Sequence, residues 1–179
     1  MLEEFLAHPA TDLHQLVVVR HAKAGRRGRF TGDDADRPLD EEGRRQAEAL
    51  VPLLDLYGVH RLSAADRVRC LQTFEPLAQR LHTEIQLEKL LTEEAYDADP
   101  GTSYARLLEL AAPSSDGVRA VCSQGKAIAP LLERWADDDG VSLPSSRYRK
   151  GSVWILTLDG HRLIQADHIP SPLPGGPDD

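Results

Sequence analysis

An arginine and a histidine stand side by side directly after a short apolar run near the start of the chain. Residues 16–19 read Leu-Val-Val-Val, and Arg20 and His21 follow. The positive charge of a neighbouring guanidinium disfavours the imidazolium form, and a neutral imidazole can attack an electrophile and carry a covalent intermediate. The planar fork of a guanidinium also matches the geometry of a phosphate group. The pair therefore suits phosphoryl transfer. A structural histidine, partly buried at a strand end, would give the same sequence pattern.

A cluster of positive charge surrounds this pair. Residues 20–29 hold Arg20, Lys23, Arg26, Arg27 and Arg29 and no acidic residue, in a chain whose formal net charge is −8. Each loop arginine alone reads as a solvated side chain, but the group suits a ligand rich in phosphate. The acidic balance of the whole chain argues against a nucleic acid polymer as partner, because such binders are usually basic. The residues singled out for substrate binding are Lys23, Arg26, Arg27 and, further along the chain, Lys126.

Apolar runs alternate with helical stripes along most of the chain. This alternation predicts an α/β three-layer sandwich, in which helices cover both faces of a mostly parallel central sheet. Asp40 is expected to cap the first helix and Gly58 to end it, and Asp159-Gly160 indicates a hairpin. The expected strands are 16–19, 59–63, 84–88, 118–122, 153–158 and 162–166; further helices are expected at 66–82, 102–112 and 126–137, and loops at 22–39 and 88–101.

One domain is expected, because 179 residues leave little room for a second. It should cover residues 14–169, with a loose lead-in at 1–13 and a disordered Pro- and Gly-rich tail at 170–179. No signal peptide or membrane-spanning stretch is visible, and Cys70 and Cys122 read as buried thiols in a reducing compartment. We therefore expect a cytoplasmic protein without membrane association. No metal-ligand spacing is present, so neither a metal nor another cofactor is expected.

Four motifs follow one another along residues 15–168. They are Arg20-His21-Ala22; Pro38-Leu39-Asp40-x-x-Gly43-x-x-Gln46-Ala47, at the start of the first helix; Arg69-Cys70-x-Gln72-Thr73; and Leu91-Thr92-Glu93. Together they resemble the histidine phosphatase superfamily, whose Arg-His-Gly signature is similar to the first motif. The likeness extends to the phosphatase modules fused behind Nudix (MutT-type) domains and to short phosphohistidine protein phosphatases, but this chain carries no Nudix motif.

The resemblance implies a phosphoglycerate mutase-like fold and a metal-independent phosphatase that works through a phosphohistidine intermediate. His21 would attack phosphorus, and Arg20 and Arg69 would bind the phosphoryl oxygens. Glu93, with Glu94 as the alternative, would protonate the leaving group and later activate water. The substrate would be a phosphorylated small molecule, above all a nucleotide, or a phosphohistidine protein.

One position departs from the pattern of the family. Where its members have a second histidine, this chain has Gln124, whose amide donates a hydrogen bond but carries no charge. Lys126 or the basic loop could supply the missing charge. Three readings stay open: a phosphatase, a phosphate-binding pseudo-phosphatase or regulatory module with little turnover, and a mutase, which usually has longer insertions. We expect Gln124 to share one pocket with the candidate nucleophile, acid and arginines named above.

Overall fold

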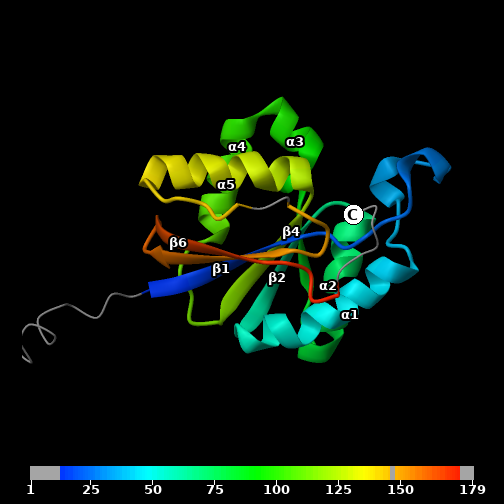
Figure 1. Cartoon of the computed structure of the whole chain (residues 1–179), viewed down its shortest axis with the longest axis horizontal. Helices are drawn as coiled ribbons and strands as arrows, with labels where there is room; N and C mark the ends of the chain where they lie inside the picture. Colours follow the sequence, from blue (N-terminus) through cyan, green and yellow to red (C-terminus); the bar gives the residue numbers. More distant parts are fainter. Residues whose placement is uncertain (1–12, 146–147, 174–179) are drawn as a thin grey trace, which may run out of the picture.

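A six-stranded sheet forms the centre of the molecule, in the strand order β3-β2-β4-β1-β5-β6. The computed structural model describes residues 13–145 and 148–173, and Figure 1 shows its ribbon. β1 lies inside the sheet, where it pairs in parallel with β4 and antiparallel with β5. The strands are β1 (Leu13–Arg20), β2 (Val59–Ala65), β3 (Ile85–Glu88), β4 (Val118–Ser123), β5 (Val153–Asp159) and β6 (Arg162–Ile169).

The sheet is mostly parallel, as predicted. β1, β2, β3 and β4 run in one direction, and β6 shares it because both β1 and β6 pair antiparallel with β5. Among the described strands, β5 alone runs against the others. The predicted hairpin is also confirmed, because Asp159 and Arg162 pair on either side of its turn. The carboxyl ends of β1, β2 and β4 therefore meet at one edge of the sheet.

Helices cover both faces of the sheet (Figure 1). α1 and α2 pack against each other on one face, and α4 and α5 lie on the other. Because both faces are covered, residues 16–19 of β1 are at most 2% exposed. The helices are α1 (Glu41–Leu56), α2 (Val68–Leu81), α3 (Glu93–Ala98), α4 (Pro100–Leu110) and α5 (Gly125–Asp139).

The start of α1 is held against the loop that leaves β1. Asp40 caps the helix as predicted, its Oδ1 accepting a hydrogen bond from the Gly43 N–H at 2.8 Å. The Lys23 carbonyl accepts from the Asp40 N–H at 3.1 Å. A Cβ on Gly43 would come within 1.8 Å of the Lys23 carbonyl oxygen. The glycine therefore lets the helix touch the loop and fixes the backbone just after His21.

The prediction of a loop at residues 88–101 is wrong. This segment forms a 3₁₀ turn at Lys89–Leu91, then α3, and then the first residues of α4. Thr92 caps α3, with its Oγ1 accepting from the Ala95 N–H at 3.1 Å, and Asp99 caps α4. Several acidic residues in a short stretch suggest a solvated loop, but in the first turn of a helix they are favourable because the N-terminus carries partial positive charge. The other expected loop, 22–39, contains two 3₁₀ turns.

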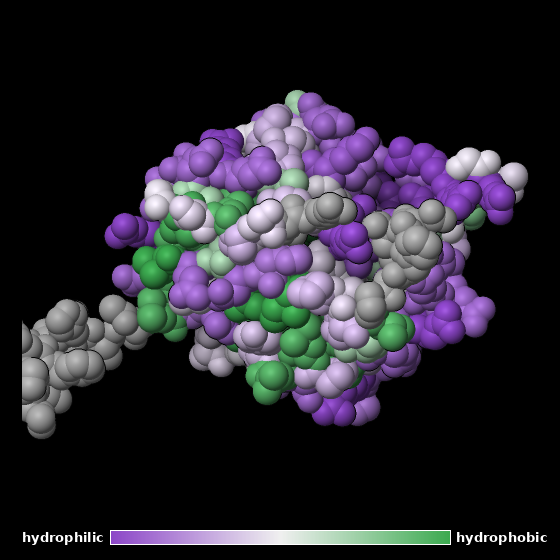
Figure 2. Space-filling model, in the orientation of Figure 1, coloured by the Kyte–Doolittle hydropathy of each residue, from purple (hydrophilic) through white to green (hydrophobic). Residues whose placement is uncertain are grey.

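The two ends of the chain lie mostly outside the described residues. Of the expected lead-in, Leu13 opens β1, and residues 1–12 lie outside the description. Of the expected tail, residues 174–179 also lie outside it. The described helices include none that is long and apolar enough to cross a membrane. The visible surface is largely hydrophilic over α5 and over the loop between β1 and α1, and apolar surface gathers near β1 and β6 (Figure 2).

Candidate active site

His21 follows the carboxyl end of β1 and is tied to the two neighbouring segments. Its N–H donates to the carbonyl of Ser123, at the end of β4, at 3.0 Å. The next N–H, on Ala22, donates to Thr73 Oγ1 at 3.0 Å, and that hydroxyl donates to the Arg69 carbonyl at 2.7 Å. The backbone around His21 is therefore fixed by β4 and α2 together.

The imidazole of His21 is held in one orientation and kept neutral. Its Nδ1 lies 2.7 Å from the Ala22 carbonyl oxygen, so Nδ1 carries the proton and Nε2 keeps its lone pair. Burial lowers the pKa of His21 to about 3, and the positive charges of Arg69, Arg20 and Lys150 add to this effect. A buried, neutral imidazole with a free Nε2 is a competent nucleophile.

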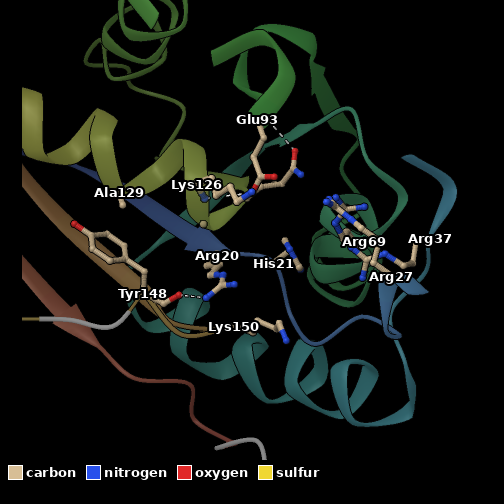
Figure 3. Close-up of a pocket in the computed structure, with 12 residues that line it drawn as sticks. Arg20, His21, Arg27, Arg37, Arg69, Glu93, Lys126, Ala129, Tyr148 and Lys150 are labelled. Carbon is tan, nitrogen blue, oxygen red and sulfur yellow. Dashed lines mark hydrogen bonds between the residues drawn. The ribbon is translucent and has the colours of Figure 1, made fainter. Parts of the chain in front are cut away.

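The predicted site residues line one cavity of about 480 Å³ (Figure 3). Arg20, His21, Arg69, Glu93 and Gln124 all border it, although they come from segments far apart in the sequence. In Figure 3, His21 lies between Glu93 on one side and Lys150 on the other, with Arg69 facing it. The remaining lining residues are Arg27, Arg37, Gly125, Lys126, Ala129, Tyr148 and Lys150.

Arg69 is buried in α2 and held by the loop between β1 and α1. Its side chain is 1% exposed, and it donates to the Asp34 carbonyl at 2.6 Å and to Asp34 Oδ2 at 3.0 Å. Arg27 and Arg37 also donate to the Asp34 carboxylate. Partial burial opposes ionisation of Asp34, but hydrogen bonds from Arg37 and Arg27 outweigh it and keep its pKa well below the usual range. One carboxylate thus positions three guanidinium groups at the cavity.

Arg20 is packed against the start of α5. Its guanidinium donates to the Tyr148 carbonyl. A Cβ on Gly125 would lie 2.8 Å from Arg20 Nε, so the guanidinium occupies space that any larger residue at position 125 would fill. The backbone N–H of Arg20 donates to the Ser152 carbonyl at 3.0 Å, which ties the end of β1 to the residue before β5. Arg20 therefore approaches the cavity from a fixed backbone.

Glu93 and Gln124 are joined to each other. The Gln124 amide oxygen accepts from the Glu93 N–H at 3.1 Å, and a Glu93 carboxylate oxygen accepts from the Lys126 N–H at 3.2 Å. Because the Gln124 oxygen is used in this way, its NH₂ remains as the donating end of the amide. Glu94 instead accepts from Arg67 at 2.5 Å, is largely exposed and does not line the cavity. The geometry therefore favours Glu93 over Glu94.

The predicted substrate-binding residues divide between two cavities. Arg27 and Lys126 line the cavity around His21, whereas Lys23 and Arg26 line a neighbouring one of about 450 Å³. Sequence reasoning missed three lining side chains: Arg37, Tyr148 and Lys150. Arg37 directly precedes the Pro-Leu-Asp motif, and this adjacency was a signal that could have found it. Lys150 comes in the basic pair before β5, which is a weaker signal.

The lining of the cavity around His21 suits an anionic group such as a phosphoryl group. Six cationic side chains line the cavity against one carboxylate, that of Glu93. Guanidinium and ammonium groups supply positive charge and hydrogen bonds to phosphate oxygens. The residues that the structure describes include no group of three or more His, Cys, Asp or Glu side chains placed to hold a metal ion. The arrangement thus offers a nucleophile, an anion cradle and a carboxyl group within one cavity.

The buried state of His21 should be visible in a pH titration. We expect the ring resonances of His21 in a proton NMR spectrum to stay unchanged from about pH 8 to about pH 5. The reason is that burial lowers the pKa of this ring in the folded protein from the ordinary pKa of 6.5 to about 3. The unfolded chain does protonate it there, so stability should fall as the pH drops from 6.5 towards 3. The His21→Ala variant assigns the resonances, and a titration midpoint near 6.5 would contradict this account.

Comparisons with known proteins agree with the motifs. The sequence model of the family described as Histidine phosphatase superfamily (branch 1) matches residues 16–136. A protein of Mycolicibacterium smegmatis named 8-oxo-(d)GTP phosphatase is 48% identical over 172 residues, which make up 96% of this chain and 52% of that protein. The chain therefore spans about half the length of this curated relative.

Solved structures share the fold at low identity. The protein histidine phosphatase SixA, complexed with tungstate, aligns with a TM-score of 0.71 and 20% identity over 89% of this chain and 97% of that one. A mycobacterial glucosyl-3-phosphoglycerate phosphatase aligns with a TM-score of 0.59 and 20% identity over 79% of this chain and 92% of that one. These likenesses confirm the predicted α/β fold. With the family match over more than half of its length, the chain belongs to the histidine phosphatase superfamily.

Proposed function

We propose that the protein is a metal-independent phosphohydrolase that works through a phosphohistidine at His21. The observation that carries the proposal is the state of His21, which is buried, oriented by the Ala22 carbonyl and neutral, in a cavity lined with guanidinium groups. Phosphoryl transfer asks a protein mainly for positioning and for positive charge around the transferred group. The fixed backbone of His21 and the guanidinium groups that line the cavity support the proposal on both points.

The reaction would take two steps. In the first, His21 Nε2 attacks phosphorus, the bond from phosphorus to the leaving oxygen breaks, and Glu93 gives that oxygen a proton. In the second, Glu93 takes a proton from water, the water oxygen attacks phosphorus, and inorganic phosphate leaves His21. Arg20 and Arg69 would stabilise the charge on the phosphoryl oxygens in both steps. Gln124 would donate its amide N–H to one of them.

The favoured substrate is a phosphorylated small molecule, in particular a nucleotide. The excess of cationic side chains in the cavity suits a strongly anionic ligand, and the curated relative is named for a nucleotide. A phosphohistidine protein is the second candidate, because a structural neighbour is named as a protein histidine phosphatase. A panel of nucleotides, sugar phosphates and a phosphohistidine peptide, assayed with and without EDTA, tests the class; activity lost with EDTA would contradict the mechanism.

A phosphate-binding module with little turnover is the alternative, and Gln124 is the observation that favours it. A histidine at this position could carry a proton and a positive charge, whereas the buried Gln124 amide offers only a neutral donor. Removing one donor of this kind costs about 10²–10³ in rate when the donor stabilises the transition state. The phosphatase and the binding module therefore differ in whether the remaining cations of the cavity make up for the charged donor that Gln124 does not supply.

Exchanging Gln124 distinguishes the two candidates. We expect Gln124→His to raise kcat by about tenfold or more, because a charged donor replaces a neutral one. Gln124→Ala should lower kcat, since it removes the donor and also the acceptor of the Glu93 N–H. The measurement is steady-state kinetics on the best substrate of the panel. Purified wild-type and Gln124→His proteins that bind phosphate tightly but turn nothing over would favour the binding module.

A further inference from the structure

A second cavity adjoins the one around His21, and positive side chains line it as well. It encloses about 450 Å³. Three of its lining residues, Arg27, Arg37 and Lys150, also line the cavity around His21. Two others, Lys23 and Arg26, are basic and border the second cavity alone. The two cavities are therefore neighbours that share three cations.

The charge balance of the second cavity favours an anion. Five cationic side chains line it, and Asp40 is the one acidic residue among the lining residues. Lys23 also pairs with Glu42, and Arg27 and Arg37 pair with Asp34, so part of this positive charge is balanced just outside the cavity. Asp40 also caps α1, where its carboxylate accepts from the Gly43 N–H and lies against the positive end of the helix. Two neighbouring cavities with a shared excess of positive charge suit a ligand that carries two linked anionic groups.

Two of the three shared cations, Arg37 and Arg27, are held in place by contacts within the loop between β1 and α1. Arg37 is 9% exposed and donates to the Gly25 carbonyl at 2.6 Å and to Asp34 Oδ1 at 2.8 Å. Arg27 makes a two-pronged contact with the same carboxylate, with both distances at 3.1 Å. An isolated bridge between Ala24 and Leu39 closes the base of the loop. Less ordering is then needed when a ligand binds, which favours affinity.

We propose that the second cavity binds a second phosphate group, so that the preferred ligand carries two linked phosphates, as a nucleoside diphosphate does. Neighbouring phosphates in such a ligand share one bridging oxygen, so their binding sites must touch, as these two cavities do. The proposal rests on the proposed function only in placing the terminal phosphate beside His21. A phosphohistidine side chain carries a single phosphate and would leave the second cavity without an anion.

Binding of two simple anions tests the proposal without any need for turnover. We expect inorganic pyrophosphate to bind the wild-type protein at least about tenfold more tightly than inorganic phosphate, as measured by calorimetry. Arg26→Glu should remove most of this preference. Arg29→Glu is the matched control, because Arg29 lies in the same loop, lines neither cavity and gives the same change of charge. This control should keep the preference for pyrophosphate.

Kinetics on nucleotides supply the second measurement. Arg26→Glu should lower kcat/KM for a nucleoside diphosphate about tenfold more than for the matching monophosphate, whereas Arg29→Glu should affect both substrates by one small factor. Equal effects of the two variants on both substrates would overturn the proposal, because long-range electrostatic steering would then explain the role of the positive side chains. Equal affinity for phosphate and pyrophosphate would overturn it as well. A protein that prefers pyrophosphate but cleaves nothing would instead contradict the proposed function alone.

Discussion

Replacing His21 with alanine should abolish turnover of every phosphate substrate that the protein cleaves. The loss should be at least about 10⁴-fold in kcat, because the nucleophile and the rest of the site act as a unit and no other group can accept the phosphoryl from the same position. The ring is oriented by the Ala22 carbonyl and buried beneath the cavity. Steady-state kinetics on the purified variant give the value.

The control for His21 is another histidine of the chain. His161 lies in the turn between β5 and β6, is exposed and lines neither cavity, so His161→Ala should keep wild-type kcat. His21→Gln guards against a folding defect, because it fills more of the space and should be equally inactive with a wild-type thermal transition. Activity that survives in a folded His21→Ala protein would show that the nucleophile lies elsewhere.

Replacing Arg69 with alanine should lower kcat by about 10²–10³-fold. Arg69 would bring a positive charge to the phosphoryl oxygens in the transition state. The loss of one donor of this kind typically lowers kcat by that factor. Asp34 also holds this guanidinium through two contacts, so the loss should loosen the loop and reduce stability. Arg69→Lys keeps the charge but not the fork, and should recover part of the rate.

Arg67 is the matched control for Arg69. It lies two residues earlier in the chain, where it pairs with Glu94 and does not line the cavity. Arg67→Ala should therefore leave kcat within about twofold of wild type, since the loss of a partly exposed ion pair has little effect. Equal losses in the two variants would mean that Arg69 acts through the fold and not on the phosphoryl group.

Local patterns predicted most of the fold because each strand and helix is encoded within a short stretch. The apolar run at 16–19 marked only the buried part of β1, which begins at Leu13. The polar residues His14 and Gln15 belong to the strand because they pair with Leu158 and Thr157 of β5, and such pairing leaves no local signal. The acidic residues of segment 88–101 favour a loop over a helix in the local pattern, and they obscure the capped starts of α3 and α4.

The site residues that belong to sequence motifs were predictable. The residues that only the tertiary structure brings to the cavity were not. Arg20 and Gln124 each lie at a strand end with a recognisable spacing, and the structure brings both to one cavity. Lys150 reaches the same cavity from the segment before β5, and its place in a basic pair is only a weak local signal of that position. Asp34 is one of several acidic residues in the loop between β1 and α1, and its contacts with three arginines arise only once the loop folds over α2.

Trapping the covalent intermediate tests most directly whether His21 carries the phosphoryl group. Enzyme mixed rapidly with a substrate labelled in the transferred phosphoryl group is quenched in base, in which phosphohistidine survives, and peptide mapping locates the label. We predict label on His21 within the first turnover, and none on the His21→Ala protein. Steady turnover with label on another residue, or with His21 unlabelled at every time, would contradict the account.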